Sequence, residues 1–241
     1  MKIRLDALLL ERNLVQQKDK ARALIGAGEV LVNERVVDKV GYLCDPEAAV
    51  RIRTHCPYVS RGGLKLAAGL DHFRIDPSGL TCIDIGASSG GFTDCLIQHG
   101  AGKVYAVDVA YGQLDWKIRQ DPRVAVLERC NARQLTPAQI PEPIDLAVMD
   151  VSFISITKIF PALLPLFTGP FALLALIKPQ FELPKEDIPR GGVVLLKELH
   201  QKAIDLVTAY ALGLGLKTEG TVPSPVLGPK GNKEFLVYLH S

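Results

Sequence analysis

From Thr81 onward, short apolar runs alternate with stretches whose apolar residues follow helical spacing. The apolar runs are TCIDIG, KVYAVDV, RVAVLE, IDLAVMD, FALLALIK and EFLVYL. Such an alternation is typical of strands joined by helical crossovers, with helices covering both faces of a parallel sheet. The pattern therefore predicts a doubly wound, Rossmann-like α/β domain, in which ligands bind along the carboxyl ends of the strands.

The longest apolar run, residues 159–177, carries no charged side chain and is long enough to cross a bilayer as a single helix. Pro161, Pro165, Gly169 and Pro170 interrupt it. Proline inside a helix removes a hydrogen bond and clashes with the preceding turn. We therefore expect a helix end followed by a buried central strand, and no membrane span.

The N-terminal part of the chain shows a different pattern. Two short helical patterns come first, and valines then flank the turn residues Asn33 and Glu34 as in a hairpin. A strand-like run follows at residues 49–53, and the polar, breaker-rich segment THCPYVSRGG marks a boundary. We expect a small α+β domain over residues 1–58 and the α/β domain over residues 59–241.

Charge and cysteine content narrow the class of protein. Residues 1–65 hold 12 Lys and Arg against 8 Asp and Glu, whereas the whole chain has a formal net charge of only +2; a basic module of this kind indicates an anionic partner. The five cysteines form no CxxC pair, so we expect neither a disulfide framework nor a metal site. The N-terminus lacks the features of a signal peptide, and we expect a cytoplasmic protein.

The strings RLDALL and KARALIGAGEVLVNERVV resemble the S4 RNA-binding module. The match departs from the usual pattern at Gln17-Lys18, where a Ser-Arg pair is common, and at Glu34, where glycine is usual. The resemblance implies that basic helical residues contact the RNA backbone, and the candidates are Arg4, Lys18, Lys20 and Arg22. The alternative is that these charges form only a solvated helix face.

The segment CIDIGASSGGFTDCL places an acidic residue, a glycine-rich turn and a helix directly after the first strand of the α/β domain. Glycines let the backbone approach a ligand there, and Asp108, at the end of the next strand, is placed to accept hydrogen bonds from ribose hydroxyls. GASSGG lacks the GxGxxG spacing of dinucleotide sites and resembles motif I of S-adenosylmethionine methyltransferases. The expected cofactor contacts are Asp84, Gly86, Ala87, Ser88, Gly90, Gly91, Phe92, Asp108, Asn131, Ala132 and Asp150.

The ends of the later strands indicate which atom accepts the methyl group. The loop after the fourth strand has no NPPY-type motif for a flipped base, and no cysteine follows the fourth or fifth strand, which disfavours base-amine and cytosine C5 methylation. Asp150 ends the fourth strand, Lys178 ends the fifth, Glu234 begins the last, and Lys65 lies in the helix before the first. We expect these four side chains to meet at one edge of the sheet.

In chain order these four residues match the Lys-Asp-Lys-Glu tetrad of FtsJ-like RNA 2′-O-methyltransferases. The strings SRGGLKL, VYAVDVAYGQLDWKIR, MDVSFIS, IKPQFE and KGNKEFLVYL resemble the TlyA family, and the resemblance covers nearly the whole chain. It implies an S4 module joined to an enzyme that methylates cytidine 2′-hydroxyls in ribosomal RNA, with ribosomal RNA or a ribosomal subunit as partner. Because the chain is short for the family, we expect the large subunit to be the substrate.

The older family label, haemolysin, leaves a membrane-active lytic protein as an alternative, and a non-catalytic ribosome-assembly factor is another. Lys178 is the candidate that activates the ribose hydroxyl, either neutral as a general base or charged as a stabiliser of the forming alkoxide. Arg61 and Lys230 flank the proposed edge and are expected to hold RNA phosphates. The sequence does not specify an oligomeric state.

Each of the remaining site residues also has a purely structural interpretation. Lys65 could be a surface lysine, Asp150 a helix cap, and Glu234 half of an exposed ion pair. Phe153 could stack on a base, but we expect a buried ring that packs against the next helix.

Overall fold

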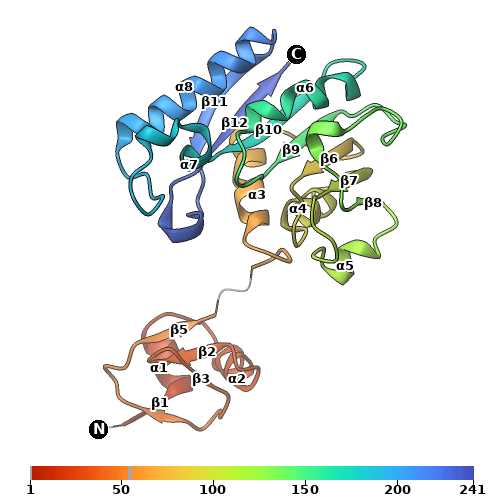
Figure 1. Cartoon of the computed structure of the whole chain (residues 1–241). Helices are drawn as coiled ribbons and strands as arrows, with labels where there is room; N and C mark the ends of the chain where they lie inside the picture. Colours follow the sequence, from red (N-terminus) through yellow and green to blue (C-terminus); the bar gives the residue numbers. More distant parts are fainter. Residues whose placement is uncertain (1, 54–55) are drawn as a thin grey trace. The chain divides into compact units, whose positions relative to one another are not determined.

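The computed structural model describes residues 2–53 and 56–241, and the chain forms two compact units that divide after residue 55 (Figure 1). The polar segment THCPYVSRGG spans this division. Two of its residues, Thr54 and His55, lie outside the described residues, and its last two residues already belong to the first helix of the second unit.

The N-terminal unit packs two helices against a small three-stranded sheet, in the order β3-β2-β5, and a separate strand pair, β1 with β4. Its elements are β1 (Ile3–Arg4), α1 (Leu5–Glu11), α2 (Lys18–Gly26), β2 (Val30–Val32), β3 (Arg35–Val37), β4 (Leu43–Cys44) and β5 (Val50–Ile52). Leu5, Leu9 and Ile25 are fully buried in its core, so the apolar positions of both helices face inward.

The predicted hairpin is confirmed in this unit. Asn33 and Glu34, between β2 and β3, both have positive φ angles, the conformation that two-residue hairpin turns require. The Asn33 side chain accepts a hydrogen bond from the Ala49 amide, and Glu34 forms a 2.6 Å ion pair with Arg51 of β5. The glutamate that replaces the usual glycine therefore connects the turn to the neighbouring strand.

The larger unit is a seven-stranded sheet in the order β11-β12-β10-β9-β6-β7-β8. Neighbouring strands are parallel except that β12 is antiparallel to both β10 and β11. The strands are β6 (Thr81–Ile85), β7 (Lys103–Val107), β8 (Val124–Leu127), β9 (Leu146–Met149), β10 (Ala172–Ile177), β11 (Lys217–Pro223) and β12 (Phe235–His240). The predicted α/β class is confirmed.

Helices cover both faces of this sheet (Figure 1). One apolar cluster joins α3 and α4 to one face, and a second joins α6 and α8 to the other. The helices are α3 (Gly62–Phe73), α4 (Gly91–Gln98), α5 (Trp116–Arg119), α6 (Phe160–Leu163), α7 (Pro179–Glu182) and α8 (Lys197–Gly213). Short 3-10 helices occur at η1 (Ala132–Gln134), η2 (Ile156–Lys158), η3 (Leu164–Leu166), η4 (Lys185–Asp187) and η5 (Pro229–Gly231).

Strand register brings the predicted site residues to one edge. Ile85 of β6 pairs with both Val107 of β7 and Met149 of β9, so the carboxyl ends of these three strands are level. Ile177 of β10 pairs with Phe235 of β12. The residue after β10 and the residue before β12 therefore lie side by side at this same edge.

The long apolar run forms a helix end followed by a buried central strand, as its prolines predict. It contains α6, η3 and then β10, which lies in the interior of the sheet between β9 and β12. Among the helices of the described residues, none has the length and apolar character needed to cross a bilayer.

Candidate active site

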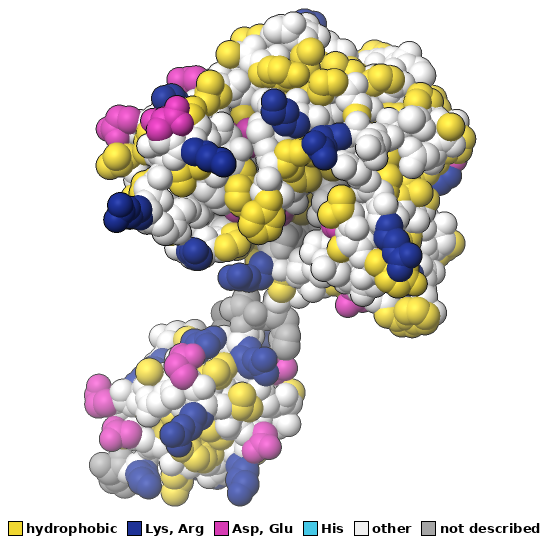
Figure 2. All heavy atoms as spheres, viewed as in Figure 1, with side chains coloured by type: hydrophobic (Ala, Val, Ile, Leu, Met, Phe, Trp, Pro, Cys, Tyr) yellow, Lys and Arg dark blue, Asp and Glu magenta, His cyan; other side chains and the backbone are white. Residues whose placement is uncertain are grey.

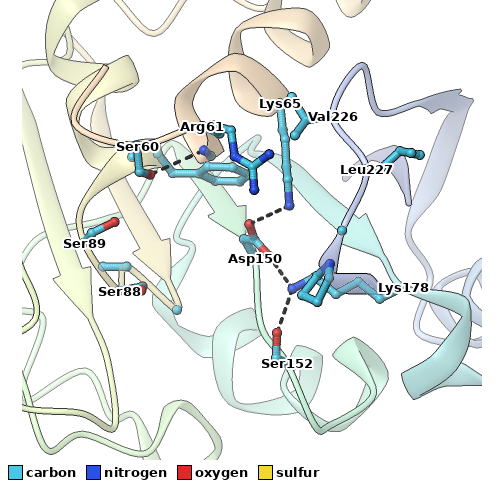
Figure 3. Close-up of a pocket in the computed structure, with 17 residues that line it drawn as sticks. Ser60, Arg61, Lys65, Ser88, Ser89, Asp150, Ser152, Lys178, Val226 and Leu227 are labelled. Atoms are coloured by element: carbon cyan, nitrogen blue, oxygen red, sulfur yellow. Dashed lines mark hydrogen bonds and ion pairs between the residues drawn. The ribbon is translucent and has the colours of Figure 1, made fainter. Parts of the chain in front are cut away.

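Four charged side chains form a continuous chain of contacts at the carboxyl edge of the sheet. The Lys65 amine donates to Glu234 Oε2 at 2.7 Å and to Asp150 Oδ2 at 3.4 Å. Lys178 Nζ lies 2.5 Å from the other Asp150 oxygen, Oδ1. Figure 3 shows Asp150 between the two lysines. Residues that are up to 169 positions apart in sequence are thus brought together.

Burial argues against the structural interpretations of these residues. Lys65, Lys178 and Glu234 are all buried, so neither lysine is a surface lysine and Glu234 is not in an exposed ion pair. Asp150 does not cap the following turn, because the Ser155 side chain accepts the capping hydrogen bond at η2. Buried charges are costly unless they are paired, and this arrangement pairs each of them.

Ser152 is a further polar contact of the site, and no sequence motif indicated it. Lys178 Nζ donates a 2.9 Å hydrogen bond to Ser152 Oγ. The loop that carries Ser152 is fixed by Glu182 of α7, which accepts hydrogen bonds from Ser155 Oγ at 2.5 Å and from the Ile156 amide at 3.1 Å. Burial raises the pKa of Glu182, and these two hydrogen bonds oppose that shift.

The expected burial of Phe153 is wrong. Its side chain is 90% exposed, and its φ of +67° lies in the left-handed region that non-glycine residues rarely occupy. The centre of the ring lies 5.2 Å from that of Phe181, and the two rings are tilted relative to each other. Because the backbone turns at Phe153, the ring points out of the core, and it lines the second of the two cavities described below.

The loop between β11 and β12 closes against Glu234. Gly228 lies so near this carboxylate that a Cβ placed on it would be 2.1 Å from Glu234 Oε1. Asn232, which is buried, holds the loop: its side chain accepts from the Val194 amide at 2.9 Å and donates to the Gly192 carbonyl at 3.0 Å. A glycine at position 228 therefore lets the loop approach the ion pair between Glu234 and Lys65.

Two adjoining cavities open onto this edge. The first, of about 520 Å³, is lined by Lys65, Lys178, Arg61 and the loop residues 226–229, among others. The second, of about 740 Å³, extends past the ends of β7 and β9. Both cavities share four lining residues, which are Gly86, Ser88, Asp150 and Ser152. A ligand in the second cavity can therefore reach Asp150 and the first cavity without leaving the cleft.

The glycine-rich turn after β6 lines both cavities, through Gly86 and Ser88. Gly86 has a φ of +87°, and a Cβ there would lie 2.6 Å from the Asp150 carbonyl oxygen. Asp108, after β7, accepts hydrogen bonds from the amides of Ser88 and Ala110, each at 2.7 Å. The Asp108 carboxylate thus fixes the turn and lines the second cavity, where its remaining lone pairs are available to hydroxyl donors.

The other expected cofactor residues lie in the second cavity, in the first cavity or at the start of α4. Asn131 and Ala132 line the second cavity. Ala87, Gly91 and Phe92 line the first. Gly90 lies just before α4 with a φ of +92°.

Asp84 is placed differently from these residues. Its carboxylate is fully buried and accepts a 2.6 Å hydrogen bond from Thr93, and it lines neither cavity. Within the described residues, its Oδ1 has no hydrogen-bond partner. Burial raises the pKa of Asp84 to about 7, although the Thr93 hydrogen bond acts in the opposite direction. This geometry gives Asp84 a role in fixing α4 to β6.

The candidate RNA-binding residues fall in both units. In the N-terminal unit, Lys18 and Lys20 are exposed, whereas Arg4 and Arg22 flank the buried carboxylate of Asp6 at 2.9 Å and 3.3 Å. The hydrogen bond from Arg4, with a smaller contribution from Arg22, lowers the pKa of Asp6 to about 2.

In the larger unit, Arg61 is exposed and lines the first cavity. Lys230, also exposed, donates to the Gly191 carbonyl at 3.3 Å and does not line either cavity. Figure 2 shows mainly Lys and Arg among the charged side chains on the visible face of this unit, with the acidic ones gathered near one side.

The fold and site together define a class of protein. A largely parallel sheet with an antiparallel β12, a glycine-rich turn after β6 and an acidic residue after β7 is the arrangement of Rossmann-like methyltransferases. The residues present also fit S-adenosylmethionine, because the second cavity offers Asp108 for hydroxyls and joins the charged site at Asp150. No cluster of His, Cys, Asp and Glu suited to a metal ion occurs in the part of the chain that the structure describes.

Comparison with known proteins identifies the family. The FtsJ-like methyltransferase family matches residues 58–241, and the S4 domain matches residues 3–50. The chain belongs to the FtsJ-like methyltransferases, in the TlyA family, and carries an N-terminal S4 domain.

Similar proteins match along nearly the whole chain. YqxC of Bacillus subtilis, described as a candidate rRNA methyltransferase, is 43% identical over 99% of this chain and 86% of its own length. The 16S/23S rRNA (cytidine-2′-O)-methyltransferase TlyA of Mycobacterium tuberculosis is 41% identical over 99% of this chain and 90% of its own. A solved structure of a candidate hemolysin from Streptococcus thermophilus has a TM-score of 0.77 and 40% identity, and covers 100% of this chain and 88% of its own.

Proposed function

We propose that this protein transfers the methyl group of S-adenosylmethionine to the ribose 2′-hydroxyl of a cytidine in ribosomal RNA. The observation that carries the proposal is the chain of ion pairs from Glu234 through Lys65 and Asp150 to Lys178, at the junction of two cavities. A buried amine held beside a cofactor-sized cavity suits activation of a hydroxyl. The name of the Mycobacterium tuberculosis relative, which specifies cytidine 2′-O-methylation of rRNA, supports the choice of acceptor.

The cofactor residues divide between the two cavities. Asp108, Asn131 and Ala132 would hold the adenosine portion in the second cavity, and the turn at Gly86 would let the remainder pass to Asp150. When bound, S-adenosylmethionine supplies an electrophilic methyl group on a sulfonium. The protein's part is to hold the ribose oxygen in line with that group, because proximity and orientation supply much of the acceleration.

Lys178 is the group we propose to act on the ribose oxygen. It lines the first cavity, and Asp150 and Ser152 hold its amine from the protein side. In its neutral form the amine would take the hydroxyl proton, and in its charged form it would stabilise the developing alkoxide. Lys65 neutralises the Asp150 and Glu234 carboxylates, which otherwise would repel an oxygen that is gaining negative charge.

Side chains around the cavities suit a nucleotide substrate. Phe153 presents an exposed ring at the mouth of the second cavity, where a base displaced from its stack would find an aromatic face. Arg61, exposed at the first cavity, would pair with a backbone phosphate. In the S4 domain, Arg4, Lys18, Lys20 and Arg22 present cations to the same polymer.

Incubation of the protein with radiolabelled S-adenosylmethionine and purified large subunits, small subunits or free rRNA tests the proposal. We expect label in large-subunit rRNA, recovered as 2′-O-methylcytidine after nuclease digestion. RNA binding without any transfer of label would favour a non-catalytic assembly factor, and leakage of liposomes that needs no cofactor would favour a lytic protein. Because the proposed substrate is ribosomal, we also propose a cytoplasmic location for this activity.

A further inference from the structure

The Lys178 amine is buried and has two polar side-chain contacts. Its nitrogen lies 2.5 Å from Asp150 Oδ1 and 2.9 Å from Ser152 Oγ, and the lysine as a whole is only 5% exposed. Lys178 and Ser152 both line the first cavity. Figure 3 shows the amine with Asp150 and Ser152 as its two contacts. Asp150 and Ser152 occupy two sides of the amine. Its remaining side faces the cavity, from which the ribose hydroxyl would approach.

The number of hydrogens on the amine explains why two acceptors matter. A charged lysine amine has three N–H groups; with two donated to Asp150 and Ser152, the third is directed to the cavity. A neutral amine has two N–H groups and one lone pair; with both N–H groups donated, the lone pair is directed to the cavity. In either protonation state, the two acceptors together fix which feature of the amine meets the ribose oxygen.

The loop that carries Ser152 is held in place relative to Lys178. Lys178 immediately precedes α7, and Glu182 at the end of that helix accepts hydrogen bonds from Ser155 Oγ and the Ile156 amide. The ring of Phe153, next to Ser152, rests against the ring of Phe181. One short helix thus positions both the lysine and its serine partner.

We propose that Ser152 is a positioning residue for Lys178, and that its hydroxyl sets the rotation of the amine so that the productive N–H or lone pair faces the 2′-hydroxyl. This inference rests on the proposed function and deepens it. Asp150 alone leaves the amine free to rotate about its bond to the Cε carbon. Ser152 removes that freedom, which is the kind of orientation that accelerates a reaction between held groups.

The pH profile of methyl transfer is a second readout of the contact between Ser152 and Lys178. A hydroxyl that accepts a hydrogen bond from a charged amine favours the charged form. The other charged groups near Lys178 are Asp150, directly after β9, and Glu182 from α7, with Lys65 from α3 and Glu234 beyond Asp150. These groups remain when Ser152 is replaced, so a change in the pH profile of a Ser152 variant reports the lost hydroxyl.

The test compares Ser152→Ala, Ser152→Thr and wild type in single-turnover methyl transfer to large subunits across pH 6 to 10, with cofactor affinity and thermal stability measured in parallel. We expect the alanine variant to lose about tenfold or more in rate at saturating substrate, with cofactor affinity and melting temperature near wild type. The threonine variant, which keeps the hydroxyl, should recover most of the rate. Ser78→Ala, at an exposed turn before β6, serves as a matched control.

The pH profile separates positioning from a merely structural role. Loss of the acceptor makes the charged amine less favoured, so the limb of the profile that reports Lys178 should move to lower pH. This direction holds for a general base, whose acidic limb moves, and for a charged stabiliser, whose alkaline limb moves. A wild-type rate and profile for Ser152→Ala would overturn the inference, and so would a slower variant with an unmoved profile that threonine fails to rescue. If wild type itself methylates no ribose, the proposed function fails and this inference fails with it.

Discussion

Two regions of the molecule place two cations around one carboxylate, and they do so in opposite ways. At the sheet edge, Asp150 lies between Lys65 and Lys178, whose side chains are 11% and 6% exposed. In the S4 domain, Asp6 is completely buried and lies between Arg4 and Arg22, whose side chains are 46% and 45% exposed. The cations are enclosed in one case and face water in the other.

We propose that this difference in exposure distinguishes residues that act in methyl transfer from residues that bind RNA. Enclosed amines are shielded from water, so their interaction with a reacting oxygen is strong and depends on exact geometry. Half-exposed arginines keep free N–H donors that can neutralise phosphates, but each such ion pair contributes little and is screened by salt. Substitutions at the sheet edge should therefore change turnover, whereas those in the S4 domain should change RNA affinity or local stability.

The largest effect is expected from Lys178→Ala. Removal of the amine at the first cavity should lower turnover on rRNA by about 10² to 10⁴-fold, the usual contribution of a proton-transfer group, with cofactor affinity retained. Steady-state methylation and calorimetric titration with the cofactor measure the two quantities. Lys158→Ala is the matched control, since Lys158 is exposed and lines neither cavity. Near-normal turnover of Lys178→Ala would contradict its assigned role.

Gly228→Ala should have the next largest effect. The added Cβ would lie 2.1 Å from Glu234 Oε1, so the carboxylate must shift and Lys65 must follow it. A misplacement of about 1 Å can cost on the order of 10²-fold in rate, and we expect a loss of that size in turnover. Gly169→Ala is the control, because a Cβ there meets no atom within 4 Å. Equal turnover for the two variants would show that the loop does not position Glu234.

Asp6→Asn should destabilise the S4 domain moderately. The pKa of Asp6 is lowered to about 2, so its ion pairs stabilise the fold at pH values above the unfolded pKa of about 4, and this contribution is lost as pH falls toward 2. With half-exposed arginine partners, we expect a loss of about 1 to 2 kcal/mol near neutral pH. Hydrogen exchange of residues 2–53 measures it, with exposed Asp19→Asn as control. Unchanged protection in Asp6→Asn would show that these ion pairs do not stabilise the domain.

The smallest effect is expected from replacing both Lys18 and Lys20 with Gln. For every phosphate of single-stranded RNA that the variant no longer neutralises, the slope of log affinity against log salt should fall by about 0.7. Binding of rRNA should weaken several-fold at low salt, while the rate at saturating RNA stays unchanged. Fluorescence titration at several salt concentrations measures the slope. If the slope keeps its wild-type value, these lysines form only a solvated helix face.

The sheet and its edge were predictable because strand periodicity and chain order determine them. Asp150 and Lys178 follow adjacent parallel strands, and Glu234 precedes an antiparallel one, so topology alone brings them to one edge. The position of Lys65 at this edge was predictable because its helix precedes β6. Predictions of this kind depend on the fold and not on side-chain detail.

Side-chain orientation at turns was not predictable in the same way. Phe153 was expected to be buried, but a left-handed backbone turns its ring outward. Asp84, within β6, accepts a hydrogen bond from Thr93 in the core, and strand periodicity does not predict that partner. Ser152 and Asn232 form hydrogen bonds to residues far away in the sequence, Lys178 and Val194, and no local pattern in the sequence indicates those partners.

The most direct test of the proposed activity is to map the methyl group on its acceptor. Large ribosomal subunits that lack the modification are incubated with isotope-labelled S-adenosylmethionine and either wild-type protein or Lys178→Ala, and the digested rRNA is analysed by mass spectrometry. We expect labelled 2′-O-methylcytidine with wild type, and labelling that is about a hundredfold or more slower with the variant. Label on a base instead of a ribose, or equal labelling by both proteins, would contradict the proposed reaction and the role of Lys178 in it.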